Sequence, residues 1–430
     1  MTSPASPLGE LFEFPLMEAI FGRRSRRFGL GMQIPSGPLA FRSNRKPVPL
    51  SELEQAILVA SATGVSGWNF GIPFGPAKPD SHAEFTLRFT GRTAPTAAGL
   101  GTPMLFYTDD DGCYVTDTRD VTPEKMQEYQ NIDDDAERIL TVCRENTTKI
   151  RDERLDLPNE PPHMLPPNLW MANAAGSTLF IPVADASEEM LGILALAISN
   201  GAMIIDGKTG QPAGNLAPFV RSGLLDENKA FPFVELVDDV YELNCLELAF
   251  MGHNIMLTMQ AMGLGGLYLS GLDRWSVLGA YADEGIEGLG FRFVDDPNSP
   301  LPNPVGLDGV FEGLCPPYYP DMHAAAEEFA RRKFGPRGAY DPESPGPWKD
   351  SRRVKESAQS YRREFVECLG EVAQYIYETR GTFPGSRTTM VLPGFVQAVH
   401  LDTDFYDEHH RPGAYLRTHA EHMEKWHGEK

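Results

Sequence analysis

The feature that most restricts the fold is a long apolar stretch in the second half of the chain, residues 241–266. Its apolar side chains recur at helical spacing and cover nearly all sides of a helix from Leu246 to Met262. Such a helix is expected to be buried on most of its faces, so other elements must pack around it. A group of glycines that starts at Gly263 is expected to end the helix.

The composition is that of a globular protein with a sizeable core: 41% of the 430 residues are hydrophobic and 23% are charged. The formal net charge of −22 argues against general binding to nucleic acid or to an anionic membrane. The most apolar run, residues 190–205, is interrupted by Ser199, Asn200 and Gly201 and is too short to span a bilayer.

The five cysteines are scattered and form no C-x-x-C pair, which indicates reduced thiols. The first residues contain acidic side chains and no continuous apolar segment of the kind found in signal peptides. These observations together predict a cytoplasmic protein.

Several local patterns predict secondary structure. Ser51 and Glu54 form a capping-box pattern at the start of a helix that Gly64 ends. Strands joined by a turn at Asp111-Gly112 are expected between residues 84 and 118. The remaining expectations are a first helix over 12–28, surface helix over 123–152, a strand over 177–185, a helix over 187–201, and helices over 323–334 and 350–380. The proline-rich segment 155–170 is expected to be either an ordered excursion or a linker, without regular structure.

The tripeptide Gly207-Lys208-Thr209 has the appearance of a phosphate-binding P-loop. The preceding glycine, Gly201, leaves five intervening residues where that motif needs four. A tight turn after a strand explains the segment, and the P-loop interpretation is rejected.

Positive charge is concentrated near the N-terminus, where Arg23, Arg24, Arg26 and Arg27 occupy four of five consecutive positions. In so acidic a chain this cluster is suited to binding one small anion. The alternative is a solvated basic patch.

Three separate pieces of the sequence resemble the nitroreductase family of flavoproteins. They are the Arg-Arg-Ser-x-Arg element at 23–27, the Ser-Gly-x-Asn loop at 66–69 and the apolar helix with its Gly-Leu-Gly end and following turn, residues 253–273. The order of the three agrees with the family, and the likeness covers residues 11–75 and 175–290.

The resemblance implies an α+β fold in which a mixed sheet is wrapped by helices. It implies a homodimer with FMN at the subunit interface and the long apolar helix as its spine. A flavin-binding domain is then expected over residues 1–300, with an insertion at about 120–175. Residues 301–430 are expected to form a helical, histidine-rich extension that wraps the core or the partner subunit.

The family pattern also assigns roles to residues. Arg23, Arg24 and Arg27 would hold the FMN phosphate and ribityl oxygens with Ser25 nearby, while Arg26 points away. The remaining cofactor-binding residues implied are Ser66, Gly67, Asn69 (reaching across from the partner subunit, or else only capping its own turn), Ser270 and Gly271. Short family members carry Glu-Gly where this chain has Ser270-Gly271. Aromatic residues that could wall the pocket, or else belong to ordinary packing, are Trp68, Phe70, Phe74 and Tyr268.

The activity implied is ping-pong hydride transfer from NAD(P)H through the flavin to a small nitro- or quinone-like acceptor. Three alternatives stay open: an oxygen-using or dehalogenating flavoenzyme, a non-catalytic binding protein of the same fold, and a metal enzyme. The last rests on the C-terminal segment, which holds six of the ten histidines. Its candidate ligands are His400, His419 and His422, the last two one helical turn apart. The alternative for these histidines is ordinary hydrogen bonding.

Overall fold

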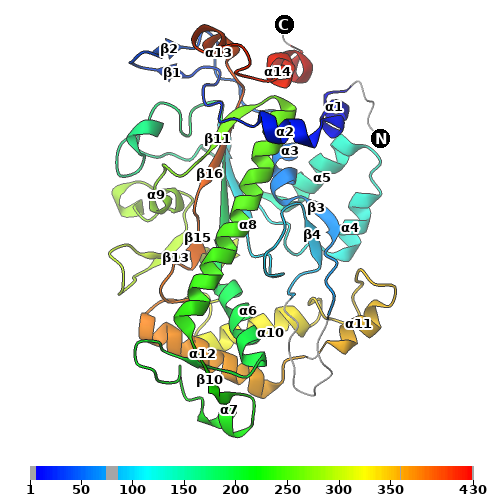
Figure 1. Ribbon diagram of the computed structural model, residues 1–430, viewed down its shortest axis with the longest axis vertical. Helices are drawn as coiled ribbons and strands as arrows, with labels where there is room; N and C mark the ends of the chain where they lie inside the picture. Colours follow the sequence, from blue (N-terminus) through cyan, green and yellow to red (C-terminus); the bar gives the residue numbers. More distant parts are fainter. Residues whose placement is uncertain (1–5, 74–85, 359, 429–430) are drawn as a thin grey trace.

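The computed structural model describes residues 6–73, 86–358 and 360–428 of the chain (Figure 1). A seven-stranded sheet lies at its centre. Its strands follow the order β11 (Gly265–Leu269), β16 (Phe395–Val399), β8 (Thr178–Asp185), β5 (Met104–Asp109), β6 (Gly112–Thr116) and β7 (Thr147–Arg151), and β15 (Met390–Val391) also pairs with β8.

Every strand pair of this main sheet is antiparallel in the described residues, so the expected mixed sheet is a wrong prediction. The physical reason is the connectivity: β5 and β6 form a tight hairpin, and no helix crosses over between neighbouring parallel strands here. Parallel pairing occurs between β9 (Ala202–Ile205) and β10 (Asp226–Pro232), outside this sheet. The coarser expectation of a fold that combines sheets and helices is confirmed.

Alternating side chains of the sheet enter two separate cores. On β5, Leu105 and Tyr107 join the larger core, whereas Met104 and Phe106 join the smaller one. The larger core is completed by helices, namely α3 (Glu52–Thr63), α6 (Ala186–Ser199), α8 (Phe233–Met262), α10 (Met322–Phe334) and α12 (Arg363–Arg380). Both faces of the sheet are therefore covered.

The remaining elements are shorter and lie around this centre. The helices are α1 (Pro7–Glu13), α2 (Leu16–Gly22), α4 (Pro123–Gln130), α5 (Asp135–Asn146), α7 (Ala217–Arg221), α9 (Arg274–Leu278), α11 (Ser351–Ser357), α13 (Thr403–His409) and α14 (Arg417–His427). The strands are β1 (Gln33–Ile34), β2 (Phe41–Arg42), β3 (Val65–Trp68), β4 (Thr90–Arg92), β12 (Arg292–Val294), β13 (Asn303–Leu307) and β14 (Phe311–Glu312). Two 3₁₀ turns span Pro166–Asn168 and Ala282–Glu284.

Helix α8 crosses the molecule diagonally in front of the sheet (Figure 1). It begins eight residues before the predicted start, directly after Pro232, and ends at Gly263, whose φ of 88° is the left-handed conformation that glycine adopts readily. The expectation of burial on most faces holds only in part. Leu246 and Phe250, one turn apart, are 49% and 38% exposed. One apolar stripe of α8 is thus uncovered in the single chain.

The N-terminal prediction needs a correction. Instead of one helix over residues 12–28, two short helices, α1 and α2, are separated at Phe14-Pro15. Pro15 is the physical reason, because a proline inside a helix removes a backbone hydrogen bond and restricts the residue before it.

The C-terminal 130 residues contribute to the sheet as well as to its surroundings. β16 lies between β11 and β8, so residues near position 397 complete a sheet that begins near position 104. The division into domains stays a prediction. Among the described residues, no helix combines the length and the apolar character that crossing a bilayer requires.

Candidate functional site

The arginine segment, residues 23–27, follows α2 and runs beside the first residues of β11. The main-chain N–H of Gly266 donates to the carbonyl oxygen of Arg26 at 2.6 Å. The Arg26 side chain is buried and donates to Ala414 O at 2.8 Å and to Gln260 Oε1, on α8, at 2.6 Å. This agrees with the expectation that Arg26 points away from its neighbours, and it fixes the segment to α8.

The other three arginines of the segment have no acidic partner in the part of the chain that the structure describes. Arg24 donates to the backbone oxygens of Phe21 and Arg23, at 3.0 and 2.7 Å. Arg27 is exposed. Burial lowers the pKa of Arg26 to about 10, and the charges of Arg24 and Arg23 act in the same direction. The segment therefore concentrates positive charge that the described protein does not neutralise.

Strand β11 leads from the arginine segment to the turn at Ser270-Gly271. Tyr268, on β11, is 38% exposed and lies between Gly252 of α8 and Gly394, the residue directly before β16. A Cβ atom at Gly252 or Gly394 would approach its ring to 2.5 or 2.6 Å, so both glycines make room for this tyrosine.

The proline-rich excursion packs against the same turn. The N–H of Leu165 donates to Gly271 O at 2.9 Å. A Cβ at Gly271 would collide with the Asn168 side-chain amide where it now lies, so this glycine allows the close approach of the excursion. Residues 155–170 contain a single 3₁₀ turn and no strand, which confirms an ordered excursion.

The loop predicted at 66–69 is a wrong prediction in its first part, because Val65–Trp68 form strand β3, which pairs with β4. This strand lies on the opposite side of α8 from β11 (Figure 1). Ser66 and Phe70 are exposed, Gly67 is buried with a φ of 111°, and Asn69 donates its side-chain N–H to Arg88 O at 3.3 Å. The Asn69 side chain is thus bonded to the segment just before β4, 19 positions further along the chain, which differs from the expected capping of its own turn. Phe74 lies outside the described residues. The structure therefore divides the predicted flavin contacts into two groups, one on each side of α8.

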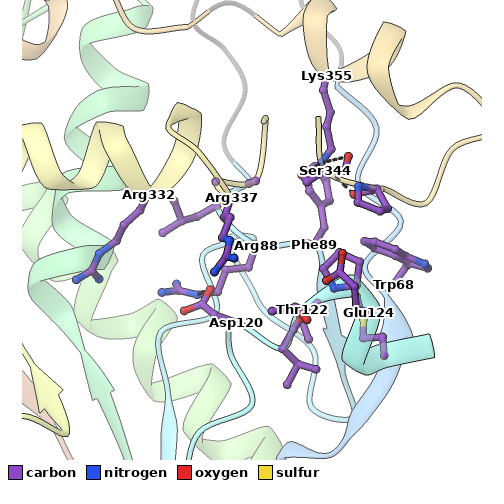
Figure 2. A pocket seen from close by; sticks show the side chains of 18 residues that line it. Trp68, Arg88, Phe89, Asp120, Thr122, Glu124, Arg332, Arg337, Ser344 and Lys355 are labelled. Atoms are coloured by element: carbon purple, nitrogen blue, oxygen red, sulfur yellow. Dashed lines mark hydrogen bonds and ion pairs between the residues drawn. The ribbon is translucent and has the colours of Figure 1, made fainter. Parts of the chain in front are cut away.

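Trp68 lines a cavity of about 450 Å³ between β3, β4, α4 and the segment after α10 (Figure 2). Two arginines that line this cavity, Arg88 and Arg332, form ion pairs with carboxylates. Arg88 contacts Asp120 at 2.9 Å and Glu188 at 2.8 Å, and Arg332 contacts Glu188 at 2.7 Å. This buried network, centred on Glu188, extends into the larger core.

Carboxyl groups beside the network have altered pKa values. Burial, together with the charge of Glu188, raises the pKa of Asp185 to about 6. Burial and the nearby Glu247 raise the pKa of Glu189 well above its usual range. Both oxygens of Glu189 lack a hydrogen bond among the described residues. A protonated, neutral Glu189 is consistent with this surrounding.

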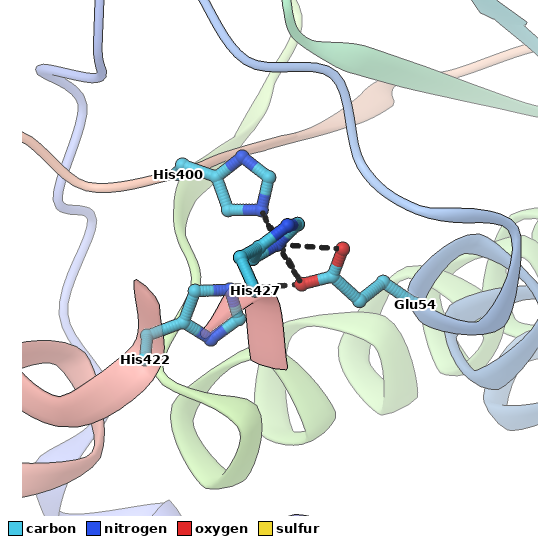
Figure 3. Close-up of side chains that lie close together, drawn as sticks. All are labelled: Glu54, His400, His422 and His427. Atoms are coloured by element: carbon cyan, nitrogen blue, oxygen red, sulfur yellow. Dashed lines mark hydrogen bonds and ion pairs between the residues drawn. The ribbon is translucent and has the colours of Figure 1, made fainter. Parts of the chain in front are cut away.

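Two of the three predicted metal candidates approach each other, and one does not. His400 and His422 converge with two residues that the sequence analysis did not select for this role, Glu54 and His427 (Figure 3). His419 faces a different environment: its Nδ1 accepts the N–H of Leu416 at 3.3 Å, and burial lowers its pKa to about 3. The sequence placed Glu54 in a capping box, which is also present, and gave no signal for its second set of contacts.

The sequence matches no protein-family model, and it matches no curated protein. Among solved structures, a candidate nitroreductase from Ralstonia eutropha JMP134 aligns with 61% of this chain and 72% of its own. The sequence identity is 15% and the TM-score is 0.28. A similarity of this size establishes neither a shared activity nor a shared topology.

Proposed function

We propose that this protein is a homodimeric FMN-dependent oxidoreductase of the nitroreductase-like type. The observation that carries the proposal is the group of three arginines without acidic partners, Arg23, Arg24 and Arg27, in a chain of net charge −22. Arginine suits phosphate because its planar guanidinium donates two parallel hydrogen bonds to the oxygens. An unneutralised cluster therefore favours a bound anion over a purely structural role.

The residues around this cluster fit the rest of a flavin. Ser25 is exposed beside the arginines, and β11 carries the chain from Gly266, bonded to Arg26, to the backbone of Ser270 and Gly271. Tyr268 offers an exposed aromatic surface on the same strand. When bound, FMN supplies hydride transfer between NAD(P)H and a small nitro- or quinone-like acceptor. The excursion at 155–170 would exclude water from one side of this site.

A second copy of the chain would complete the site. Leu246 and Phe250 of α8 form an exposed apolar stripe, and such stripes are typical of subunit interfaces. A two-fold axis running along this face brings the β11 side of one copy opposite the β3 side of its partner. Asn69 of one subunit would then approach the arginine segment of the other, which accounts for the separation of the two groups in one chain.

The first experiment measures FMN binding by absorption and fluorescence titration. The purified protein should be yellow, or become yellow with added FMN. The double variant Arg23→Ala/Arg27→Ala should bind FMN at least about 100-fold more weakly, because each charged hydrogen bond contributes about 1.5–3 kcal/mol. The matched control is Arg352→Ala/Arg363→Ala, which removes two positive charges from side chains that are 56% and 92% exposed.

Two outcomes would contradict parts of the proposal. A wild-type protein that takes up no FMN rules out the flavin. Equal FMN affinity in wild type and in the Arg23/Arg27 variant removes the arginines from the phosphate site.

The dimer is tested separately by light scattering. Phe250→Glu should shift the protein from dimer to monomer, because a charge in an apolar interface is costly. Phe231→Glu is the matched control, since Phe231 lies on β10 with nearly the same exposure, 39% against 38%. Identical masses for both variants would place the interface elsewhere.

A further inference from the structure

We propose that Glu54, His400, His422 and His427 bind one divalent transition-metal ion, zinc by the chemistry of their donor atoms, and that this ion fastens α14 to the fold. The inference goes beyond the proposed flavin chemistry and does not depend on it. All four ligand atoms lie within 4.8 Å of one another.

The four residues come from three distant parts of the chain. Glu54 is in the first turn of α3, His400 directly follows β16, and His422 and His427 are on α14 (Figure 3). Glu54 and His400 have side chains that are fully buried, and that of His422 is 2% exposed. His427 is 17% exposed, which leaves a route by which an ion reaches the site.

The hydrogen bonds of the backbone fix two of the imidazole tautomers. His400 Nδ1 lies 2.9 Å from Val48 O, and His422 Nδ1 lies 2.8 Å from Met262 O. A carbonyl oxygen can only accept, so each Nδ1 carries a proton and donates it. In the neutral imidazoles, Nε2 then presents a lone pair. Backbone acceptors of this kind orient metal-binding histidines in known sites.

Those lone pairs point at other electron-rich atoms. His422 Nε2 is 2.8 Å from Glu54 Oε1, yet the contact lacks hydrogen-bond geometry and this nitrogen has no hydrogen bond within the described chain. His400 Nε2 lies 3.3 Å from Glu54 Oε1 and 3.1 Å from His427 Nε2. Without a cation, these lone pairs and the carboxylate oxygen would face one another inside a nearly water-free site, which is costly.

Four of the six separations among the ligand residues are close to those around a four-coordinate metal. Bonds of 2.0–2.1 Å in a tetrahedral arrangement place neighbouring ligand atoms about 3.3 Å apart. His427 Nε2 lies 3.3 Å from both oxygens of Glu54, and the other close pairs span 2.8 to 3.3 Å.

The hydrogen bonds of Glu54 leave one of its two carboxylate oxygens available as a metal ligand. Its Oε2 accepts the N–H of Ser51 at 2.7 Å and the Ser51 hydroxyl at 2.8 Å, the two contacts at the start of α3. Oε1 is left facing the histidines. Three imidazole nitrogens and one carboxylate oxygen suit zinc or a neighbouring transition metal and do not suit calcium or magnesium, which prefer oxygen ligands.

The position of the site indicates a structural role for the ion. Four protein ligands around a buried centre are typical of closed structural sites. His422 connects α14 to the end of α8 through Met262, and His400 O accepts the N–H of Leu30, a few residues after the arginine segment. The ion would therefore hold α14, β16 and the N-terminal region together.

The test is a measurement of metal content and affinity on the full-length protein, whether or not it is coloured by flavin. Elemental mass spectrometry should find about one zinc per chain after growth with zinc. His427→Ala and Glu54→Gln should weaken zinc binding, titrated against a chromogenic chelator, by more than about 100-fold, because loss of a partner outside the ligand set already costs about 10–100-fold.

His410→Ala is the matched control, since it removes an exposed histidine from the same C-terminal segment and should bind zinc like wild type. His427→Ala changes the last residue of α14 and is the variant least disruptive to folding, which circular dichroism checks. A wild-type protein that takes up neither zinc, cobalt nor iron at micromolar concentration overturns the proposal and indicates a buried imidazolium–carboxylate pair. Unchanged affinity in both variants overturns it as well.

Discussion

Two groups of arginines in this molecule have opposite surroundings. At the N-terminus, Arg23, Arg24 and Arg27 have no carboxylate partner among the described residues. In the interior, Arg88 and Arg332 converge on Glu188, whose side chain is fully buried. The residue type is the same, but only the interior group is neutralised by the protein itself.

The difference separates charges that hold the fold from charges that are available to a ligand. Removing one member of a buried, paired network leaves its partner uncompensated, which is strongly destabilising. Removing an exposed, unpaired charge leaves nothing unsatisfied. Stability measurements on the protein without ligands can therefore test the assignment of each group independently of any activity.

The largest effect is expected for Arg88→Met. The substitution leaves Glu188 with Arg332 as its remaining cation and frees Asp120, so the free energy of unfolding should fall by about 3–5 kcal/mol. Urea unfolding followed by circular dichroism measures this. The control Arg363→Met, at a 92% exposed side chain, should have little effect. A loss below about 1 kcal/mol for Arg88→Met would mean that the network adds little to stability.

The next effect is a pH dependence beside the same network. Asp185 has a pKa of about 6 in the folded protein, above its ordinary value of 3.8, so its protonated form is favoured there. Protonated Asp185 therefore contributes to the stability of the folded protein. This contribution is fully present below pH 3.8 and is lost as the pH rises through 6. Asp185→Asn stays neutral and still caps α6, so its stability relative to wild type should rise by about 2 kcal/mol between pH 4 and 7. Parallel stability curves for the two proteins would contradict the raised pKa.

An intermediate effect is expected for the one structural arginine of the N-terminal segment. Arg26→Met leaves Ala414 O and the Gln260 side chain without their donor, which should cost about 2 kcal/mol. Calorimetry should show a lower Tm than for Arg24→Met, whose exposed guanidinium bonds only nearby backbone. Equal Tm values would show that Arg26 does not anchor the segment.

The smallest effects should come from Arg23→Ala and Arg27→Ala. In flavin-free protein each should change the free energy of unfolding by no more than about 0.5 kcal/mol, since neither side chain has an ion-pair partner among the residues described. Urea unfolding followed by circular dichroism measures these changes as well. A loss above about 1 kcal/mol at either position would reveal a structural role and remove the contrast with Arg88.

The sequence predicted those elements that depend on residues close together along the chain. The capping box at Ser51 and Glu54, the hairpin at Asp111-Gly112 and the glycine end of α8 are all present. The turn at Asp206-Gly207 follows β9, in agreement with rejection of a P-loop. Each of these depends on residues only a few positions apart, which is why sequence alone could identify them.

Long-range contacts account for what the sequence did not predict. β7 lies within the stretch 123–152 that was assigned to surface helix, because pairing with β6 outweighs its polar composition. Glu54 and His400 are separated by 346 positions, so no spacing rule could connect them. His422 and His427 lie five residues apart, outside the usual one-turn spacing of paired helical ligands.

The place of β16 also determines when this chain can finish folding. β11 joins the main sheet through β16 alone among the described strands, and β16 begins at Phe395. During synthesis, β8 must therefore wait with its β16 edge unpaired until nearly the whole chain has left the ribosome, and unpaired edges favour aggregation. Contacts so distant in sequence are slow to form. The nascent protein is therefore expected to need protection by chaperones until its last residues have been made.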